Sequence, residues 1–536
     1  MTPPRVLLLS LLMLPVQPGL LAEESQPGEN QIKVSKIVVV SHPIFDESAE
    51  DAFFIHNWAN FLHINTREQT VLDHLSFAPG DIIDNKDIAE AQRLLRAEPF
   101  LRDSKITLPK PDPAATVANR DVVLVETWDN WSLLPTLSFS RSGGENRYSI
   151  GIKEDNLMGR GISTRLKYQS SEDRTGYKLA IDAPVNWLPH ASVSAEIYDN
   201  SDGQAYKFAF IKPFFTLDGI NQYGLETLED LREDTLRQNG EDVSGFEHEI
   251  SYTNVNYGHR LDWDDSTALR LLLGITHDHH RFNLWEDYPD ARLPEDREFL
   301  YPWVALESIE DEYKVFQNIR LINTNEDINL GWYHFFKLGV ETRTDNSDPG
   351  FHLWWRSSRG FKQADSLWLL SANGKAVLNT RIPDHYQLAL QGEWYYNFSE
   401  SWKLYHRLRL LSSKNNYLDQ PATLGDNTGV RGYPDDYQWG DQQWQFTSEL
   451  RYYPNISLYQ LAELGWALFA DAGEAFGEND DNNLLSGPMA SVGLGARIYS
   501  SRSSYGNVAH VDFSLPLNRA PGLDSWEWRF QVRSHF

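Results

Sequence analysis

From residue 131 to the end of the chain, apolar and polar residues alternate with a period of two. In residues 443–452 a polar side chain stands at every second position, namely Gln443, Gln445, Thr447, Glu449 and Arg451. The same alternation recurs in residues 402–410 and 490–498. Successive side chains of a β-strand point to opposite faces, so one face of such a strand can meet lipid and the other water. The pattern predicts a transmembrane antiparallel β-barrel over residues 131–536.

The alternation indicates two or three strands more than sixteen, and single-chain barrels of this class have an even number of strands. A soluble β-sandwich alternates in the same way, but we do not expect aromatic residues to flank its polar face over a dozen segments. The expected fold class is therefore mainly β, with a membrane barrel in place of a sandwich.

The helical pattern is concentrated in residues 32–127. Thr66 and Gln69 predict a capping box at the start of one helix, and a second helix is expected to begin near Asn85. An aromatic stretch, residues 45–62, is inserted before the first of these helices. Short strands are expected at residues 37–40, 105–108 and 121–127. The pattern predicts a small, compact α+β domain ahead of the barrel.

Residues 1–22 have the three regions of a secretory signal peptide. They comprise a single charge at Arg5, an apolar core over residues 6–14, and small Ala22 before acidic residues. We expect the mature protein to start near Glu23. No later apolar run approaches the ~18 residues that a spanning helix needs, so any membrane crossing should use β-strands.

Composition excludes several classes of function. The chain has 536 residues, with 48 Lys and Arg against 76 Asp and Glu, and a net charge of -28. A nucleic-acid partner is not expected, because binding would require a basic surface. Cys is absent, which excludes disulfides, thiol nucleophiles and Cys-ligated metals.

Catalytic and metal-binding signals are weak. The sequence contains no Gly-x-Ser-x-Gly, Walker or His-Glu-x-x-His motif. The most metal-like cluster spans residues 277–280, where His277 and His279 share one face of a strand and His280 follows. Clustered His at a strand end is more often found in a loop or at the membrane interface. We therefore predict no catalytic residue, metal or cofactor, and no enzymatic activity.

Two short motifs in the last third of the chain narrow the interpretation. The first, Gly429-Val430-Arg431-Gly432-Tyr433-Pro434, lies in a polar stretch at about 413–441 between two strands. The second is Phe469-Ala470-Asp471-Ala472-Gly473. Because Trp466 and Leu468 occupy one face of the second strand, Phe469 and Asp471 occupy the other, which faces the lumen.

Together with the N-terminal domain, these motifs resemble the BamA/TamA-type superfamily of outer-membrane protein assembly and translocation. Its members carry periplasmic POTRA domains followed by a bacterial surface antigen β-barrel of sixteen strands. Weaker matches are Trp131 to Pro135 at the junction, Gly143-Gly144, and residues 154–161. The resemblance implies one POTRA domain at 32–127 and a barrel of about sixteen strands.

The resemblance also implies functional residues. Arg431, on a loop folded back into the barrel, would pair with Asp471 and lock the loop in the lumen. Six residues would support this lock: Val430, Gly432, Tyr433, Phe469, Gly473 and Glu449. Outer-membrane barrels present their last strand to the assembly machinery, so Phe536, Val532 and Phe530 would form the barrel assembly signal.

The resemblance implies an outer-membrane protein of a Gram-negative bacterium with its POTRA domain in the periplasm. The strand edge at residues 105–108 would capture an unfolded protein client, and the barrel would insert or translocate it. Other expected partners are outer-membrane lipid, lipopolysaccharide and the barrel assembly machinery. Two alternatives are a passive outer-membrane channel and a lipid-handling enzyme. A channel would use the lumen charges Lys403, Arg407, Arg409, Glu449 and Arg451.

Overall fold

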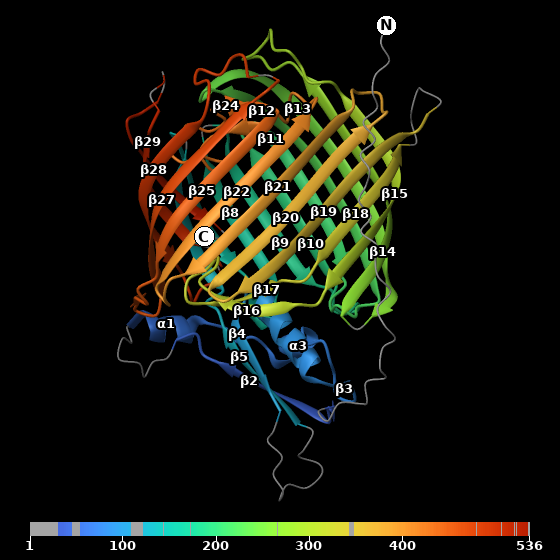
Figure 1. The fold of residues 1–536 in the computed structure, drawn as a ribbon. Helices are drawn as coiled ribbons and strands as arrows, with labels where there is room; N and C mark the ends of the chain where they lie inside the picture. The colour runs from blue at the N-terminus through green and yellow to red at the C-terminus, as the bar shows by residue number, and fades with distance from the viewer. Residues whose placement is uncertain are drawn as a thin grey trace, which may run out of the picture.

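The computed structural model describes residues 31–45, 54–108, 122–142, 144–171, 173–264, 266–341, 348–478, 480–504, 506, 508–518, 520 and 523–533. The expected signal peptide at 1–22, Gly143 and Phe536 lie outside these residues. Figure 1 shows a large β-barrel with a small N-terminal module at one end. Within the described residues, no helix has both the length and the apolar character needed to cross a membrane.

The N-terminal module, residues 31–129, is built on a three-stranded sheet in the order β2-β5-β4. Strand β2 (Lys36–His42) runs parallel to β5 (Val122–Asp129), and β4 (Leu101–Thr107) runs antiparallel to β5. A separate small pair joins β1 (Ile32–Lys33) to β3 (Ile82–Ile83). The strand predicted at 105–108 is therefore an edge strand, as expected, and it begins earlier in the chain.

Helices α2 (Glu68–Asp73) and α3 (Asn85–Ala97) complete the module. Asp84 caps α3, because its side chain accepts hydrogen bonds from the N–H groups of Lys86 and Asp87. The capping box predicted at Thr66 is wrong. Helix α2 has Arg67 as its N-cap without a side-chain bond, and the Thr66 hydroxyl accepts a bond from Asn156 instead.

The aromatic stretch before α2 contains a helix that was not predicted from the sequence, α1 (Phe54–Leu62). Its large side chains Phe54, Trp58 and Phe61 are exposed, whereas His56 and Ala59 are buried. The exposed aromatic residues recur at helical spacing, so the apolar stripe of this helix faces away from its buried side. In Figure 1, α1 lies at the rim of the barrel on the module side.

The barrel is closed, and its wall consists of long antiparallel strands. In chain order they are β6 (Leu133–Ser142), β7 (Glu145–Glu154), β8 (Ser163–Ser170), β9 (Thr175–Pro184), β10 (Ser192–Asn200), β11 (Gly203–Lys212), β12 (Asn221–Gln238), β13 (Glu241–Asp264), β14 (Thr267–Asn283), β15 (Arg297–Glu310), β18 (Tyr333–Glu341), β19 (Gly350–Gln363), β20 (Ser366–Leu378), β21 (His385–Asn397), β22 (Trp402–Lys414), β25 (Gln442–Tyr452), β27 (Ala462–Phe476), β28 (Met489–Tyr499), β29 (Val508–Pro516) and β30 (Glu527–Arg533). The two-residue strand β26 (Ser457–Leu458) joins the sheet beside β27. A 3-10 turn, η2 (Leu157–Gly159), follows β7.

The fold class predicted from the sequence, a mainly β antiparallel barrel, is confirmed, but the strand count of about sixteen is too low. Within the described residues, twenty long strands form the wall. The alternation itself already indicated more than sixteen strands, and the lower number came from the resemblance.

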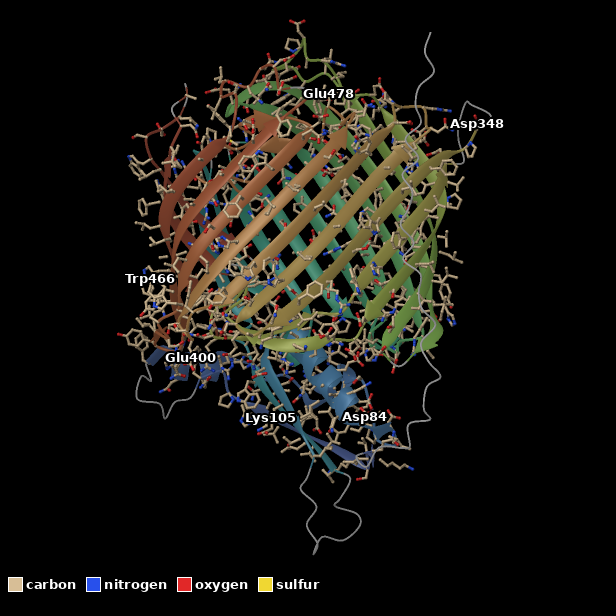
Figure 2. All side chains as sticks on the ribbon, viewed as in Figure 1. Asp84, Lys105, Asp348, Glu400, Trp466 and Glu478 are labelled. Carbon is tan, nitrogen blue, oxygen red and sulfur yellow. The ribbon has the colours of Figure 1, made fainter. Side chains whose placement is uncertain are left out.

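The two faces of the wall separate as predicted. On β25 the side chains of Gln443, Gln445, Thr447, Glu449 and Arg451 are all buried toward the lumen. On β27 the outward Trp466 and Leu468 are exposed, and Figure 2 shows Trp466 on the outside of the wall near the module. An apolar outer surface around a polar, side-chain-filled interior is the arrangement expected of a barrel in lipid.

Strands β30 and β6 close the barrel through a short seam. Among the described residues, one register pair joins these strands, with Phe530 opposite Arg141. Side chains add to it, since Arg141 forms an ion pair with Glu527 at 2.8 Å and Phe139 stacks on Trp528. The next junction, β29 with β30, has seven register pairs from Val508 to Ser514. The seam is therefore held mainly by side chains.

Two hairpins that are not part of the wall lie at the barrel ends. The hairpin of β16 (Tyr313–Gln317) and β17 (Asn325–Asn329) lies between β15 and β18 in the sequence and between the module and the barrel in space (Figure 1). The hairpin of β23 (Thr423–Leu424) and β24 (Gln438–Trp439) lies at the opposite end. Figure 2 places Asp348 and Glu478 at that opposite rim.

Candidate functional site

The lumen loop, residues 415–441, connects β22 to β25 and folds back into the barrel. Its apolar side chains pack with the inner wall in one buried cluster formed by Leu424, Val430, Tyr433, Tyr437, Ala475 and Met489. Burying about four large side chains of the loop in this way stabilises its position by roughly 1.5–3 kcal/mol for each. The loop bounds agree with the stretch expected at 413–441 to within two residues.

Arg431, near the tip of the lumen loop, meets Asp471 on β27. Its Nε donates to Asp471 Oδ2 at 2.6 Å and its Nη2 donates to Asp471 Oδ1 at 3.0 Å. The side chains of both residues are almost fully buried. A two-point contact between a planar guanidinium and a carboxylate fixes both distance and orientation. The structure thus brings together the two residues that the sequence singled out, and their role as a lock stays a prediction.

Glu449 on β25 extends this contact into a charge cluster. One carboxylate oxygen of Glu449 lies 2.8 Å from Arg431 Nη1, and the other accepts a bond from Arg451 Nε at 2.9 Å. Arg497 on β28 pairs with Asp512 on β29 at 2.5 Å. The cluster therefore contains three guanidinium groups and three carboxylates. Balanced charges of this kind offset the cost of burying each ion.

The other predicted supporting residues surround Arg431. The ring of Phe469 lies under the guanidinium, 3.5 Å from its central carbon. The Tyr433 hydroxyl donates to the Ala490 carbonyl at 2.9 Å. Gly432 has φ of +89°, a conformation that residues with a Cβ rarely adopt. A Cβ at Gly473 would lie 3.2 Å from a methyl carbon of Val430, so this glycine leaves room for the loop tip.

The hairpin of β16 and β17 contacts inner-wall side chains at the module end of the barrel, and we call residues 313–329 the plug hairpin. Ile322 in its connecting segment is fully buried with Tyr499 and Val508 of the wall and with Tyr453, which follows β25. Lys403 Nζ donates to the Gln317 carbonyl at 2.8 Å. The Glu326 carboxylate accepts bonds from the N–H groups at the turn. Burial raises the pKa of this carboxyl, and these hydrogen bonds act in the opposite direction.

The plug hairpin and the lumen loop are connected through one wall strand. Arg451 Nη1 donates to the Ile319 carbonyl of the plug hairpin at 3.1 Å, while its Nε bonds Glu449. Glu449 in turn contacts Arg431 of the lumen loop. A displacement of either insertion should therefore change the contacts of the other.

The plug hairpin also contacts the module. Arg96 of α3 makes a two-point bond to Asp327, with N–O distances of 2.8 and 2.7 Å. Arg93 of the same helix lies over the ring of Tyr313 at 4.1 Å. These contacts hold α3 of the module against the plug hairpin.

A second set of contacts fixes the module to the barrel turns. Asn156, in the segment 154–161 noted in the sequence, donates to the Thr66 hydroxyl at 2.8 Å. The Thr70 hydroxyl donates to the Gly159 carbonyl at 2.8 Å. Buried Asp129 accepts a bond from the Thr66 N–H at 2.7 Å. The segment 154–161 therefore forms a turn on which α2 docks, and this contact accounts for the motif noted in the sequence.

The His cluster is divided between the two faces of β14. His277 and His279 lie on the outer face with exposed Leu273 and Ile275, and their rings are 6.3 Å apart. His280 lies on the inner face, 2.8 Å from His248 of β13. The sequence pattern did not bring out His248, because its partner is on a different strand and 32 residues away.

Three members of the charge cluster were not selected from the sequence as lock residues: Arg451, Arg497 and Asp512. Period-two alternation places all three on the lumen face, so the pattern contained the signal for their orientation. Their pairing depends on the register between strands, which a single sequence does not specify.

Known families and structures give a further test. Residues 353–498, which include both Arg431 and Asp471, match the family model described as haemolysin secretion/activation protein ShlB/FhaC/HecB. The resemblance to the BamA/TamA-type superfamily is confirmed. No curated protein matches the sequence.

Solved structures of this superfamily resemble the chain at low identity. BamA from Haemophilus ducreyi lacking POTRA domains 1-3 is 14% identical, with a TM-score of 0.40, covering 94% of this chain and 84% of that one. CdiB from Acinetobacter baumannii is 13% identical, with a TM-score of 0.47, covering 94% and 74%. CdiB from Escherichia coli is 11% identical, with a TM-score of 0.46, covering 96% and 93%.

Proposed function

We propose that this chain is an outer-membrane protein of a Gram-negative bacterium that receives an unfolded polypeptide in the periplasm and passes it through the barrel. The N-terminal module is the POTRA domain in this proposal, and it faces the periplasm. The lumen loop lies on the extracellular side. No catalytic step is included, and the prediction that the chain is not an enzyme stays a prediction.

The observation that carries this proposal is the buried lumen loop within the matched region. The Arg431–Asp471 contact and its acceptor strand β27 both lie in the part that matches a secretion and activation family. A loop held in the lumen by a charged pair is a removable obstruction, since ion pairs can exchange for water and other partners without breaking the wall. The plug hairpin at the other end adds a second closure.

The location proposed for the chain agrees with its aromatic surface. Trp466 is exposed on the wall near the module end (Figure 2). Tyr459 is also exposed, and its carbonyl lies 2.7 Å from His56 of α1. The exposed side chains of α1 are Phe54, Trp58 and Phe61. Trp and Tyr gather at membrane–water interfaces, where an apolar ring and a polar group each find a suitable environment. Contact with outer-membrane lipid and lipopolysaccharide, and assembly by the barrel assembly machinery, belong to the same proposal.

The edge of the module sheet at β4 is the proposed capture site. Lys105 in the middle of β4 is exposed, and Figure 2 shows it on the module away from the barrel. Two N–H groups of this edge bind side chains instead of a strand. Ser104 donates to Asp103 and Ile106 donates to Gln92 of α3, both at 2.8 Å. An extended client would replace these two bonds with backbone bonds.

Because the chain contains no Cys, the capture site can be tested with single-Cys variants. We expect Lys105→Cys, fitted with a photo-crosslinker in growing cells, to capture polypeptides that mass spectrometry identifies as secreted or outer-membrane proteins. Lys36→Cys on β2, the opposite edge of the same sheet, is the matched control. Equal amounts of crosslinked polypeptide from the two edges, or none from β4, would show that the β4 edge is not the capture site.

Insertion into the membrane is a second candidate function, favoured by the short seam. A barrel whose first and last strands share one register pair in the described residues can part there more easily than elsewhere. A passive channel is disfavoured, because the lumen loop and the plug hairpin obstruct the two ends of the pore. Lipid handling lacks a supporting arrangement of residues in the described part of the chain.

A further inference from the structure

The inner wall near the lumen loop carries a cluster of two histidines and three carboxylates outside the lock. His248 of β13 and His280 of β14 face each other, and Asp419 of the lumen loop lies next to them. One ligand atom from each of these three residues lies within 4.8 Å of the other two. The side chains of His248 and Asp419 are almost fully buried, while that of His280 remains partly accessible.

Each histidine is oriented by a carboxylate on its far side. His248 Nδ1 lies 2.7 Å from Asp234 Oδ2, and His280 Nε2 lies 3.1 Å from Asp278 Oδ1. A ring nitrogen this close to a carboxylate favours carrying the proton, because a bare nitrogen would oppose the oxygen lone pairs. The two remaining nitrogens, His248 Nε2 and His280 Nδ1, then both present lone pairs.

These two nitrogens are 2.8 Å apart. Two lone pairs at that separation repel each other unless a proton lies between them or a metal ion lies beside them. With Zn–N bonds of about 2.0–2.1 Å, tetrahedral coordination also requires the two nitrogens to separate to about 3.3 Å. Two imidazoles whose outer nitrogens rest on carboxylates form the usual support of a metal-binding histidine pair. We propose that His248, His280 and Asp419 bind a divalent metal ion of the Zn²⁺ type.

Asp419 can serve as the third ligand without leaving its present partner. Arg297 of β15 binds both Asp419 oxygens at 2.8 Å, and each carboxylate oxygen has a second lone pair for a metal ion. Two nitrogen donors and one oxygen donor suit Zn²⁺, whereas Ca²⁺ and Mg²⁺ prefer oxygen alone. The local charge also favours a cation. Arg232 and Arg297 pair with two of the three nearby carboxylates, so these five groups carry one net negative charge.

The proposed ion would join the lumen loop to the barrel wall at a second place. Asp419 lies near the start of the loop, and Arg431 lies near its tip on the other side of the lumen. A metal ion bound to β13, β14 and the loop would restrain the base of the loop independently of the Arg431–Asp471 pair. The metal site does not depend on the proposed transport function.

Purified full-length protein, stripped with a chelator and titrated with ZnCl₂, tests the assignment. We expect one Zn²⁺ per chain by calorimetry and elemental analysis, with no competition from Ca²⁺ or Mg²⁺. His280→Gln removes a proposed ligand and should weaken binding by more than the roughly tenfold loss that is typical of outer-shell partners. His279→Gln, one residue away on the outer face of the same strand, should bind like the wild type. Zn²⁺ should also protect the lumen loop from protease in the wild type and in His279→Gln, but not in His280→Gln.

Absence of saturable Zn²⁺ binding by folded wild-type protein would overturn the proposal and leave a shared proton between the histidines. An equal loss in His279→Gln and His280→Gln would also overturn it, since binding would then belong to exposed surface histidines.

Discussion

Replacing Arg431 by alanine should loosen the tip of the lumen loop while leaving the barrel assembled. The change removes the guanidinium that Asp471 and Glu449 share, and the Asp471 carboxylate then stays buried without that partner. Breaking a buried pair in this way costs about 3–5 kcal/mol. The wall should survive, because its backbone hydrogen bonds form a closed ring. Limited proteolysis of outer membranes should show rapid cleavage within residues 415–441, and heat-modifiable gel mobility should show a folded barrel.

Arg160→Ala is the matched control, because Arg160 is an exposed arginine on a turn at the module end. In Arg160→Ala the lumen loop should resist protease as it does in the wild type. A double-mutant cycle with Arg431→Ala and Asp471→Ala measures the interaction itself. The loss of protease protection in the double variant should be much less than the sum of the losses in the two single variants. Strict additivity would show that the pair does not hold the loop.

Placing a charge at Ile322 should open the module end of the pore. Ile322 of the plug hairpin is fully buried against Tyr453, Tyr499 and Val508, and burial of such a side chain is worth about 1.5–3 kcal/mol. Ile322→Asp loses this contribution and adds the cost of an unpaired carboxylate in the same place. We expect the plug hairpin to leave the lumen and single-channel conductance in planar bilayers to rise several-fold.

Val315→Asp provides the control on the same hairpin, since Val315 on β16 is exposed. Its conductance should equal that of the wild type. Comparable conductance in the wild type and in Ile322→Asp, with both barrels assembled, would mean that the plug hairpin does not close the pore. If Ile322→Asp also makes the lumen loop protease-sensitive, the connection through Arg451 and Glu449 transmits the change.

The sequence predicted the wall from a local signal, and it predicted the central pair from its resemblance to a known superfamily. Period-two alternation determines which side chains face the lumen, and it correctly placed Glu449 and Asp471 inside and Trp466 outside. The resemblance based on the motif around Arg431 implied a loop in the lumen, and glycine at position 432 has the backbone conformation that the loop tip needs. The facing of each wall residue requires no knowledge of which strands are neighbours, whereas the pair was known only through the resemblance.

Features that depend on contacts between distant residues were missed. The plug hairpin has polar strands whose alternation resembles that of any wall hairpin, and only its position in space distinguishes it. Helix α1 is a different case, since Phe54, Trp58 and Phe61 recur at helical spacing and this local signal was overlooked in the aromatic stretch. The pairing of His248 with His280 depends on the register of β13 and β14, which alternation does not specify.

The central claim is that the chain moves polypeptides, and comparing proteins after its deletion tests this most directly. Outer-membrane fractions and culture medium from the deletion strain should be quantified by mass spectrometry, with the strain complemented by wild-type protein or by Arg431→Ala. We predict that a defined set of proteins disappears from one of these fractions, returns with the wild type, and returns poorly with Arg431→Ala. An unchanged set of proteins in both fractions, accompanied only by altered uptake of small solutes, would contradict the proposal and support a passive channel.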